Sequence, residues 1–165
     1  MTLAATLAML GGGAVAQDGP VSGAPQDGAP LWLISCSNLL DPDELLCEFS
    51  QSIVLTQGGQ SNRLASAAFT RVAGQSGTNA LFSLPFEVSL ADPVRVSVDD
   101  KEVGTLAWQS CDAGGCHASG PVDDGWLRAM RAGSQLSAAL KARDGRDLSF
   151  GFQLKDFSRT EKLLP

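Results

Sequence analysis

The nine residues Ser110–Ala118 read SCDAGGCHA and contain two of the four cysteines of the chain. If this stretch is the tip of a β-hairpin, its centre lies between Ala113 and Gly114, and Cys111 faces Cys116 on paired strands. Residues that face each other on antiparallel strands have Cα atoms about 4.5–5.5 Å apart, which is within disulfide range. Glycine supplies the positive φ angles that a tight tip needs. We therefore expect a hairpin that is clamped across its strands.

The other two cysteines repeat this arrangement, because Cys36 and Cys47 are equidistant from the Asp41-Pro42 turn. Four cysteines allow three connectivities, and cysteine spacing alone does not choose among them. Turn symmetry does provide a reason here, since each pair straddles its own turn. The sequence therefore predicts two local disulfides, Cys36–Cys47 and Cys111–Cys116.

The start of the chain is typical of an export signal. Residues 1–16 carry no charge, and the apolar run ends in Ala14-Val15-Ala16, a small-x-small cleavage pattern. The basic region that usually opens a signal peptide is missing, and an uncleaved anchor is the alternative. The apolar run is shorter than the roughly 20 residues of a membrane span. We expect a signal peptide over residues 1–16, a disordered leader over 17–30 and one folded domain over 31–165.

The net charge and the expected cellular compartment limit the partners that this protein can have. The net charge is −6 and no basic run occurs, which argues against nucleic acid or an anionic membrane surface as a partner. An exported chain with four cysteines is most simply a protein with two disulfides. We expect a periplasmic or secreted protein that has no membrane span after signal cleavage.

Short alternating segments dominate the rest of the chain and indicate an all-β fold. Residues 123–133 form the first helical candidate, with Asp123 or Asp124 as N-cap, and residues 156–164 form a short terminal helix. Residues 57–62, which include Gly59, are expected to be an open loop. The pattern predicts eight or nine short strands at spacing typical of a β-sandwich, with the clearest at residues 31–37, 45–56, 64–72, 79–84, 94–98, 102–109, 135–142 and 146–154.

The last hairpin can be predicted in register. A three-residue loop over 143–145 places Leu140 opposite Leu148, whereas a two-residue loop would place Leu140 opposite Ser149. A slip of one residue turns every side chain to the other face, so the apolar pattern selects the three-residue loop. Gly145 then occupies a left-handed position, and a β-branched residue is expected to cost more there than at Gly59.

Catalytic chemistry finds little support in the sequence. His117 is the only histidine, and no G-x-S-x-G elbow occurs. His117 follows Cys116, which leaves a thiol-dependent enzyme as an alternative. A cysteine in a disulfide is no nucleophile, however, and adjacent residues of a strand point to opposite faces.

Metal binding is also weakly supported. The four cysteines have ten and four residues between the members of each pair, unlike the tight C-x₂-C knuckle of zinc sites. The acidic cluster at Asp41, Asp43 and Glu44 lacks the alternating ligands and glycine of an EF-hand loop. We expect no metal and no cofactor, with a zinc site built from the cysteines and His117 as the alternative.

The order and spacing of several weak motifs resemble the invasion-associated locus B (IalB) family of exported bacterial proteins over residues 31–164. Two departures occur: Glu87 follows Pro85-Phe86 where members usually have glycine, and Asp156-Phe157 replaces Gly-Phe. The motifs that carry the resemblance are Trp32 with Cys36, Cys47 with Gln51, Leu84-Pro85 with Val88 and Leu90, the Cys111–Ala118 hairpin, the helix ending at Gly133, and Leu154-Lys155-Asp156-Phe157.

The resemblance implies an immunoglobulin-like β-sandwich, export to the periplasm or beyond, and no established enzymatic activity. We therefore expect a non-enzymatic binding module with a protein or envelope partner, and a role in host-cell invasion is possible within this family. The alternative is an exported enzyme that depends on a thiol or a metal at Cys116 and His117.

Overall fold

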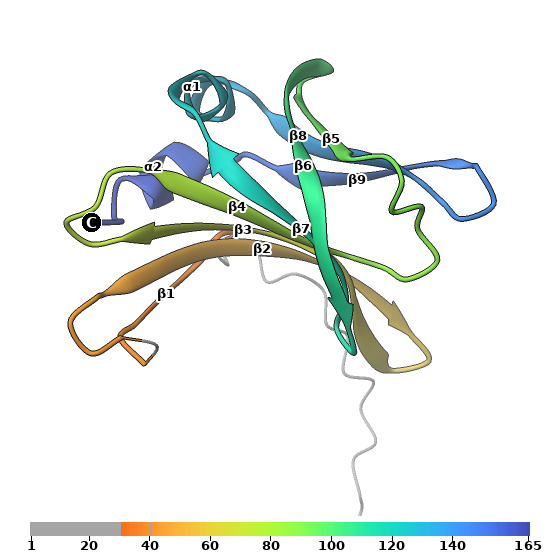
Figure 1. The fold of residues 1–165 in the computed structure, drawn as a ribbon, viewed down its shortest axis with the longest axis horizontal. Helices are drawn as coiled ribbons and strands as arrows, with labels where there is room; N and C mark the ends of the chain where they lie inside the picture. The colour runs from red at the N-terminus through yellow and green to blue at the C-terminus, as the bar shows by residue number, and fades with distance from the viewer. Residues whose placement is uncertain (1–30, 40) are drawn as a thin grey trace, which may run out of the picture.

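The computed structural model describes residues 31–39 and 41–165 and shows two layers of antiparallel strands with two short helices at one end (Figure 1). The predicted signal peptide (1–16) and leader (17–30) lie outside the described residues. The strands are β1 (Leu33–Ser37), β2 (Leu46–Gln57), β3 (Gln60–Val72), β4 (Thr78–Leu84), β5 (Val94–Val98), β6 (Lys101–Asp112), β7 (Gly115–Val122), β8 (Gln135–Lys141) and β9 (Asp147–Gln153), and the helices are α1 (Asp124–Ala132) and α2 (Phe157–Glu161).

The strands of the described chain form one continuous sheet in the order β1-β2-β3-β4-β7-β6-β5-β8-β9. Strand β6 passes between the layers, because its first half pairs with β5 and its second half, from Ala107 onward, pairs with β7. A bulge between Trp108 and Ser110 accompanies the change of partner, and bulges bend a strand and increase its twist. The sheet therefore curls on itself, with β2, β3 and β4 facing β5, β8 and β9 (Figure 1).

The all-β prediction is confirmed, since nine strands and two short helices make up the regular structure of the described residues. The two layers of the sandwich are halves of a single curled sheet. The sequence could not show this, because the connection between the layers is made within one strand rather than by a loop.

The β8–β9 hairpin has the predicted register. Leu140 pairs with Leu148, and Lys141 pairs with Asp147. The N–H of Gly145 donates to the carbonyl of Ala142 at 2.9 Å, and Gly145 has a φ of +88°. The three-residue loop and the left-handed glycine are therefore confirmed.

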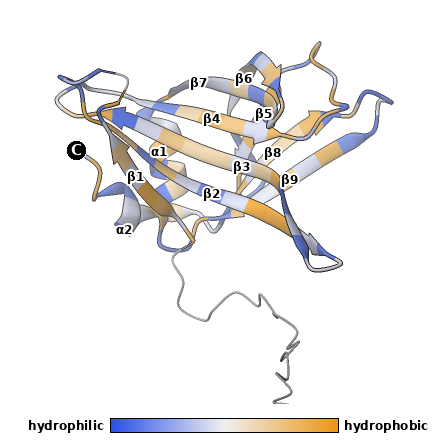
Figure 2. Cartoon of the chain, turned by 90° about the horizontal axis from the view of Figure 1, so that it is seen from below, coloured by the Kyte–Doolittle hydropathy of each residue, from blue (hydrophilic) through white to orange (hydrophobic). Residues whose placement is uncertain are grey.

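The predicted open loop over residues 57–62 is wrong. Strands β2 and β3 continue through it, with Gln57 paired to Gln60 across a two-residue turn. Gly58 and Gly59 have φ angles of +60° and +79°, which is the positive pair that a tight type I′ turn requires. Polar residues mark the tips of the β2–β3 and β8–β9 hairpins in Figure 2. The turn therefore needs a positive φ at Gly59 just as the other hairpin does at Gly145, which removes the structural reason for expecting a larger cost at Gly145.

The turn between β5 and β6 is tight although it contains no glycine. Val98 pairs with Lys101, so the loop has two residues, Asp99 and Asp100. Both have positive φ angles, +46° and +66°, although neither is glycine. The Asp99 carboxylate accepts hydrogen bonds from the backbone N–H groups of Ser134 and Gln135, at 3.0 Å for the shortest to each. These bonds tie the turn to the start of β8.

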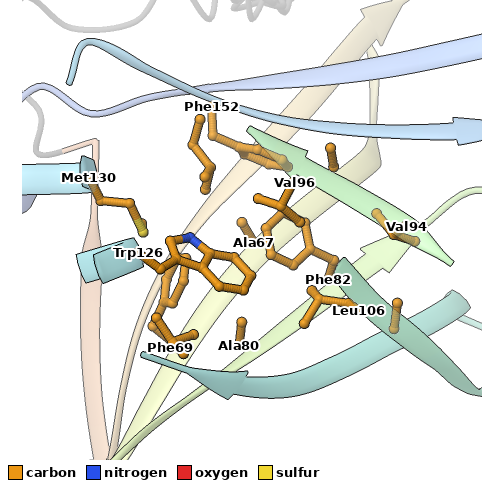
Figure 3. Packing of buried hydrophobic residues seen from close by; sticks show 14 of the residues in the cluster. Ala67, Phe69, Ala80, Phe82, Val94, Val96, Leu106, Trp126, Met130 and Phe152 are labelled. Atoms are coloured by element: carbon orange, nitrogen blue, oxygen red, sulfur yellow. The ribbon is translucent and has the colours of Figure 1, made fainter. Parts of the chain in front are cut away.

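An aromatic cluster fills the space between the layers. Phe69 is fully buried, and its ring centroid lies 5.2 Å from Phe49, 5.9 Å from Trp32, 5.9 Å from Phe157 and 6.3 Å from Phe82. Figure 3 shows Trp126 and Met130 of α1 pointing into the same group of apolar side chains. The N-terminal strands, both helices and the C-terminal strands thus share one core.

Helix α1 covers one end of this core. Its N-cap is Asp123, whose carboxylate accepts a hydrogen bond from the N–H of Trp126 at 2.7 Å. Trp126, Leu127 and Met130 are buried, as the predicted apolar stripe requires. The sequence left Asp123 and Asp124 as alternative caps, and the structure selects Asp123.

The two departures from the family pattern fall where the backbone favours glycine. Glu87 has a φ of +65° and Asp156 has a φ of +63°. A non-glycine residue in this left-handed region costs about 1–2 kcal/mol. At both positions a residue with a Cβ therefore occupies a backbone conformation that glycine adopts most readily.

A buried carboxylate holds α2 against the sheet and α1. Glu161 is only 3% exposed. Its Oε1 accepts a hydrogen bond from Arg131 Nη2 at 2.8 Å, and Arg71 of β3 donates to the same oxygen. Hydrogen bonding to Arg131 is the largest effect that lowers the pKa of Glu161, and Arg71 lowers it further. Burial alone would raise this pKa, so the two guanidinium groups are what keep the carboxylate ionised.

The Glu161 contacts predict a specific acid dependence of stability. Because folding lowers the pKa of Glu161, its contribution is fully present above the unfolded value of about 4.3 and is lost as the pH falls through the folded-state pKa. We expect Glu161→Gln to be less stable than the unsubstituted protein at pH 7, with a smaller difference at pH 3. Urea unfolding at the two pH values measures this, and an unchanged difference would contradict the assignment.

Candidate functional site at the Cys111–Cys116 hairpin

The four cysteines lie in two separate hairpins. Cys111 pairs with Cys116 across β6 and β7, and Cys36 pairs with Cys47 across β1 and β2. Each pair is joined by a disulfide with a Cα–Cα distance of 4.0 Å. Cys47 and Cys116 are buried in the core, so each disulfide links the free end of a hairpin to packed residues.

The tip at residues 112–115 is ordered by one carboxylate and one glycine. Asp112 Oδ1 accepts a hydrogen bond from the N–H of Gly114 at 2.7 Å. Gly115 is buried and has a φ of +128°, and a Cβ added to it would lie 2.3 Å from the carbonyl oxygen of Leu84. The hairpin therefore packs directly against the backbone at the end of β4, and glycine is required at this position.

His117 lies beside this tip on the outer face of the sheet. Its Nδ1 is 3.0 Å from Ser83 Oγ, and its Nε2 is 3.0 Å from Asp112 Oδ1. The contact with Asp112 has the distance of an ion pair but departs from the direction of the ring N–H. Register explains the approach of Ser83, because it pairs with His117 in the β4–β7 ladder.

The charges at the tip favour an ionised Asp112. Its contact with His117 contributes most to lowering the pKa of Asp112, followed by the hydrogen bond from the N–H of Gly114. Arg63, from the β2–β3 hairpin, acts in the same direction. The guanidinium of Arg63 lies beside the tip, since a Cβ on Gly114 would be 3.3 Å from its Nη2. Asp112 itself is exposed to water, which screens these interactions.

Ser83, His117 and Asp112 contain the residue types of a nucleophilic triad, and Ser83 is the member that the sequence did not reveal. The two partners are 34 positions apart, and no local motif marks the serine. Acyl transfer also needs preorganised donors for the developing oxyanion. Strand β4 is paired on both sides, to β3 and to β7, so the backbone around Ser83 is engaged in the sheet. We therefore interpret the three residues as a polar cluster that braces the hairpin.

The structure separates the residues of the predicted thiol or metal alternative. Cys116 is buried and bonded to Cys111, whereas His117 faces outward to Ser83 and Asp112. Within residues 31–39 and 41–165, no group of three or more His, Cys, Asp or Glu side chains is placed to share a metal ion. Among the same residues, no helix is long and apolar enough to cross a membrane.

Fold and site together define a small antiparallel β-sandwich protein with a disulfide in each of two hairpins. A sequence-family model, described as invasion associated locus B (IalB) protein, matches residues 32–164. The chain belongs to the IalB family. The resemblance found from the sequence is thereby confirmed.

Individual relatives agree with this assignment. Two proteins of Brucella abortus (strain 2308, and biovar 1 strain 9-941), each described as an invasion protein B homologue, are 27% identical to the chain over 127 residues, or 76% of this chain and 70% of theirs. The crystal structure of invasion associated protein B from Bartonella henselae superimposes with a TM-score of 0.70 at 21% identity, covering 80% of this chain and 88% of that one. At this identity the Bartonella structure shows a shared fold.

The disulfide of the hairpin gives a direct prediction. We expect the double substitution of Cys111 and Cys116 by serine to lower stability by about 2–3 kcal/mol and to leave a folded domain, because the loop it closes is short. Thermal unfolding of the variant measures this loss, and peptide mapping under non-reducing conditions tests the pairing. A fragment that joins Cys36 or Cys47 to either later cysteine would contradict it.

Proposed function

We propose that this protein is an exported, non-enzymatic binding module of the bacterial envelope, with a protein or envelope component as its partner. The observation that supports export most directly is the placement of all four cysteines in disulfides. Disulfides of this kind persist in oxidising compartments such as the periplasm or the outside of the cell. The proposed location is therefore periplasmic or secreted.

The binding role rests on the fold and on the pairing of β4 on both sides, which engages the backbone around Ser83 in the sheet. β-Sandwiches commonly present their hairpin ends as binding surfaces on a rigid scaffold. The names of the Brucella and Bartonella relatives refer to invasion. We extend this to the chain only as a proposal that its envelope function can include a role at the host-cell surface.

Export has a simple test. N-terminal sequencing of protein from a periplasmic or culture fraction should begin at Gln17, after cleavage behind Ala16. Mature protein that retains residues 2–15 would contradict the proposed signal peptide. Detection on the cell surface or in the supernatant is the first requirement for any role in invasion.

The binding role is tested by crosslinking in intact cells followed by purification of the protein under denaturing conditions. A partner recovered reproducibly with this protein, and absent with an unrelated exported disulfide protein, supports the proposal. Recovery of the same components with both proteins would refute it. Thiol titration of the native protein tests the enzymatic alternative, because two or more free thiols would restore Cys116 and His117 as candidates.

A further inference from the structure

Strand β9 ends the sheet, and the hydrogen bonds to β8 reveal which of its backbone groups are free. The N–H of Ala142 donates to the carbonyl of Arg146 at 2.8 Å, and the N–H of Leu154 donates to the carbonyl of Ser134 at 2.9 Å. Even-numbered residues on the β9 side of the ladder therefore bond to β8. Since bonding direction alternates along an antiparallel strand, the odd-numbered residues direct their N–H and C=O groups away from β8.

One of these outward positions is already occupied by a side chain. The N–H of Gln153 donates to Gln51 Oε1 at 2.8 Å, and Gln51 Nε2 donates to the carbonyl of Gln153 at 2.9 Å. The carboxamide of Gln51 thus satisfies both groups, as a peptide unit of a neighbouring strand would. Gln51 is only 9% exposed, so its side chain is part of the buried structure. The edge of β9 can evidently accept an amide partner.

The remaining outward positions are open. Ser149 and Gly151 are exposed, and no side-chain bond to their backbone groups occurs within the described residues. Strands at sheet edges are usually protected by charge, proline or a bulge. Residues 148–153 contain neither a charged side chain nor a proline, and their ladder with β8 has no bulge. At the other end of β9, Asp147 Oδ1 lies 2.8 Å from Lys141 Nζ in an ion pair.

Two partly buried apolar side chains lie along this edge. From Gln153 toward Asp147, β9 diverges from β2, so the two layers separate beyond the Gln51 contact (Figure 1). Leu148 and Phe150 are only partly buried against the core. An added strand would cover them with its own inward side chains and would meet no charge between residues 148 and 153.

We propose that the β9 edge from Asp147 to Gly151 binds an extended, uncharged segment of a partner protein by strand addition. This inference rests on the proposed binding function and specifies its mode. The bound segment pairs through its backbone, carries apolar side chains at alternate positions and has no proline where its N–H groups face β9. A second copy of the folded domain is disfavoured, because the chain carries a net charge of −6 and two copies repel each other.

A matched pair of variants isolates the backbone contribution. Ser149→Pro removes an outward N–H that has no bond within the free domain, so the β8–β9 ladder should survive. Ser149→Ala retains this N–H and changes the side chain alone. The probe is a displayed library of linear twelve-residue peptides, selected on the unsubstituted domain, with affinities of synthesised hits measured by calorimetry.

We expect selected peptides to have apolar residues at alternate positions and to slow amide hydrogen exchange at Ser149 and Gly151 in the unsubstituted domain. Ser149→Pro should weaken their binding at least about tenfold, a loss of about 1.4 kcal/mol, while Ser149→Ala should change it less than about twofold. Failure to select any peptide that protects these two amides would overturn the proposal. Equal affinities for the two variants would also overturn it, as would protection of the edge by dimerisation without peptide. The exchange measurement decides the matter even if Ser149→Pro does not fold.

The same variants distinguish a failure of strand addition at β9 from a failure of the proposed binding function. If a specific partner crosslinked in cells is retained by Ser149→Pro, the edge is not its binding site and the binding function stands. If no specific partner is crosslinked to the unsubstituted protein, the binding function itself fails.

Discussion

Phe69→Ala is expected to destabilise the domain by about 3–5 kcal/mol, the range for deleting a buried phenylalanine side chain. Phe69 is fully buried, and its ring contacts aromatic residues of both the N-terminal strands and α2. The space that it leaves cannot collapse easily, because the surrounding rings belong to separate segments of the chain, including α2. Chemical unfolding at pH 7 should therefore show a loss equal to a large share of the roughly 5–15 kcal/mol that stabilises a typical domain.

Leu55→Ala provides the matched control. Leu55 is also a large apolar residue of the same curled sheet, but it is 55% exposed near the tip of the β2–β3 hairpin. Its substitution should change stability by about 0.5 kcal/mol or less. Similar losses for the two variants would mean that the aromatic cluster does not form the centre of the core.

Gly115→Ala is expected to cost about 3–4 kcal/mol, although it adds only one methyl group. A φ of +128° is strained for any residue with a Cβ, and the added atom would lie 2.3 Å from the backbone oxygen of Leu84. A backbone atom cannot move aside as the end of a flexible side chain can, so the hairpin itself must shift. Thermal unfolding should show the loss, and weaker protection of the β6–β7 amides should show where the structure yields.

Gly145→Ala is a control that introduces backbone strain without the steric clash expected at Gly115. Gly145 also has a positive φ, +88°, but nothing lies within 4 Å of a Cβ built there. Its substitution should therefore cost only the left-handed backbone preference, about 1–2 kcal/mol. If the two variants lost the same stability, contact with β4 would contribute nothing at Gly115.

Local patterns in the sequence predicted much of the fold. The alternation of Val94, Val96 and Val98 marks a strand because these side chains face the core and their neighbours do not. The register of the β8–β9 hairpin followed from apolar pairing, since a slip would bury polar residues. The tip of the β2–β3 hairpin was missed for the opposite reason. Residues 57–62 bury nothing, so no alternation distinguishes their paired strands from a loop.

The contacts that sequence reasoning could not predict join residues that are far apart in the chain. Ser83 approaches His117 only because β4 and β7 are neighbours, and this pairing connects segments 34 positions apart. Arg71 and Glu161 are 90 positions apart, and neither lies in a pattern that predicts burial. The hairpin around Cys111 and Cys116, by contrast, was accessible because both strands and the turn between them lie in one short stretch.

The closure of the sandwich by Gln51 and Trp32 on Gln153 has a kinetic consequence. These contacts join residues 102 and 121 positions apart, and chains rich in such separations fold slowly, on the scale of milliseconds to seconds. If the chain is exported with its N-terminus first, Phe49 and Phe69 emerge long before Phe157, the aromatic partner of both. Until the C-terminal segments follow, the first strands have an uncovered apolar face and a free edge. A partly folded chain of this kind is prone to aggregation. The yield of exported protein would therefore follow the rate at which the last strand and helix arrive rather than the stability of the finished fold.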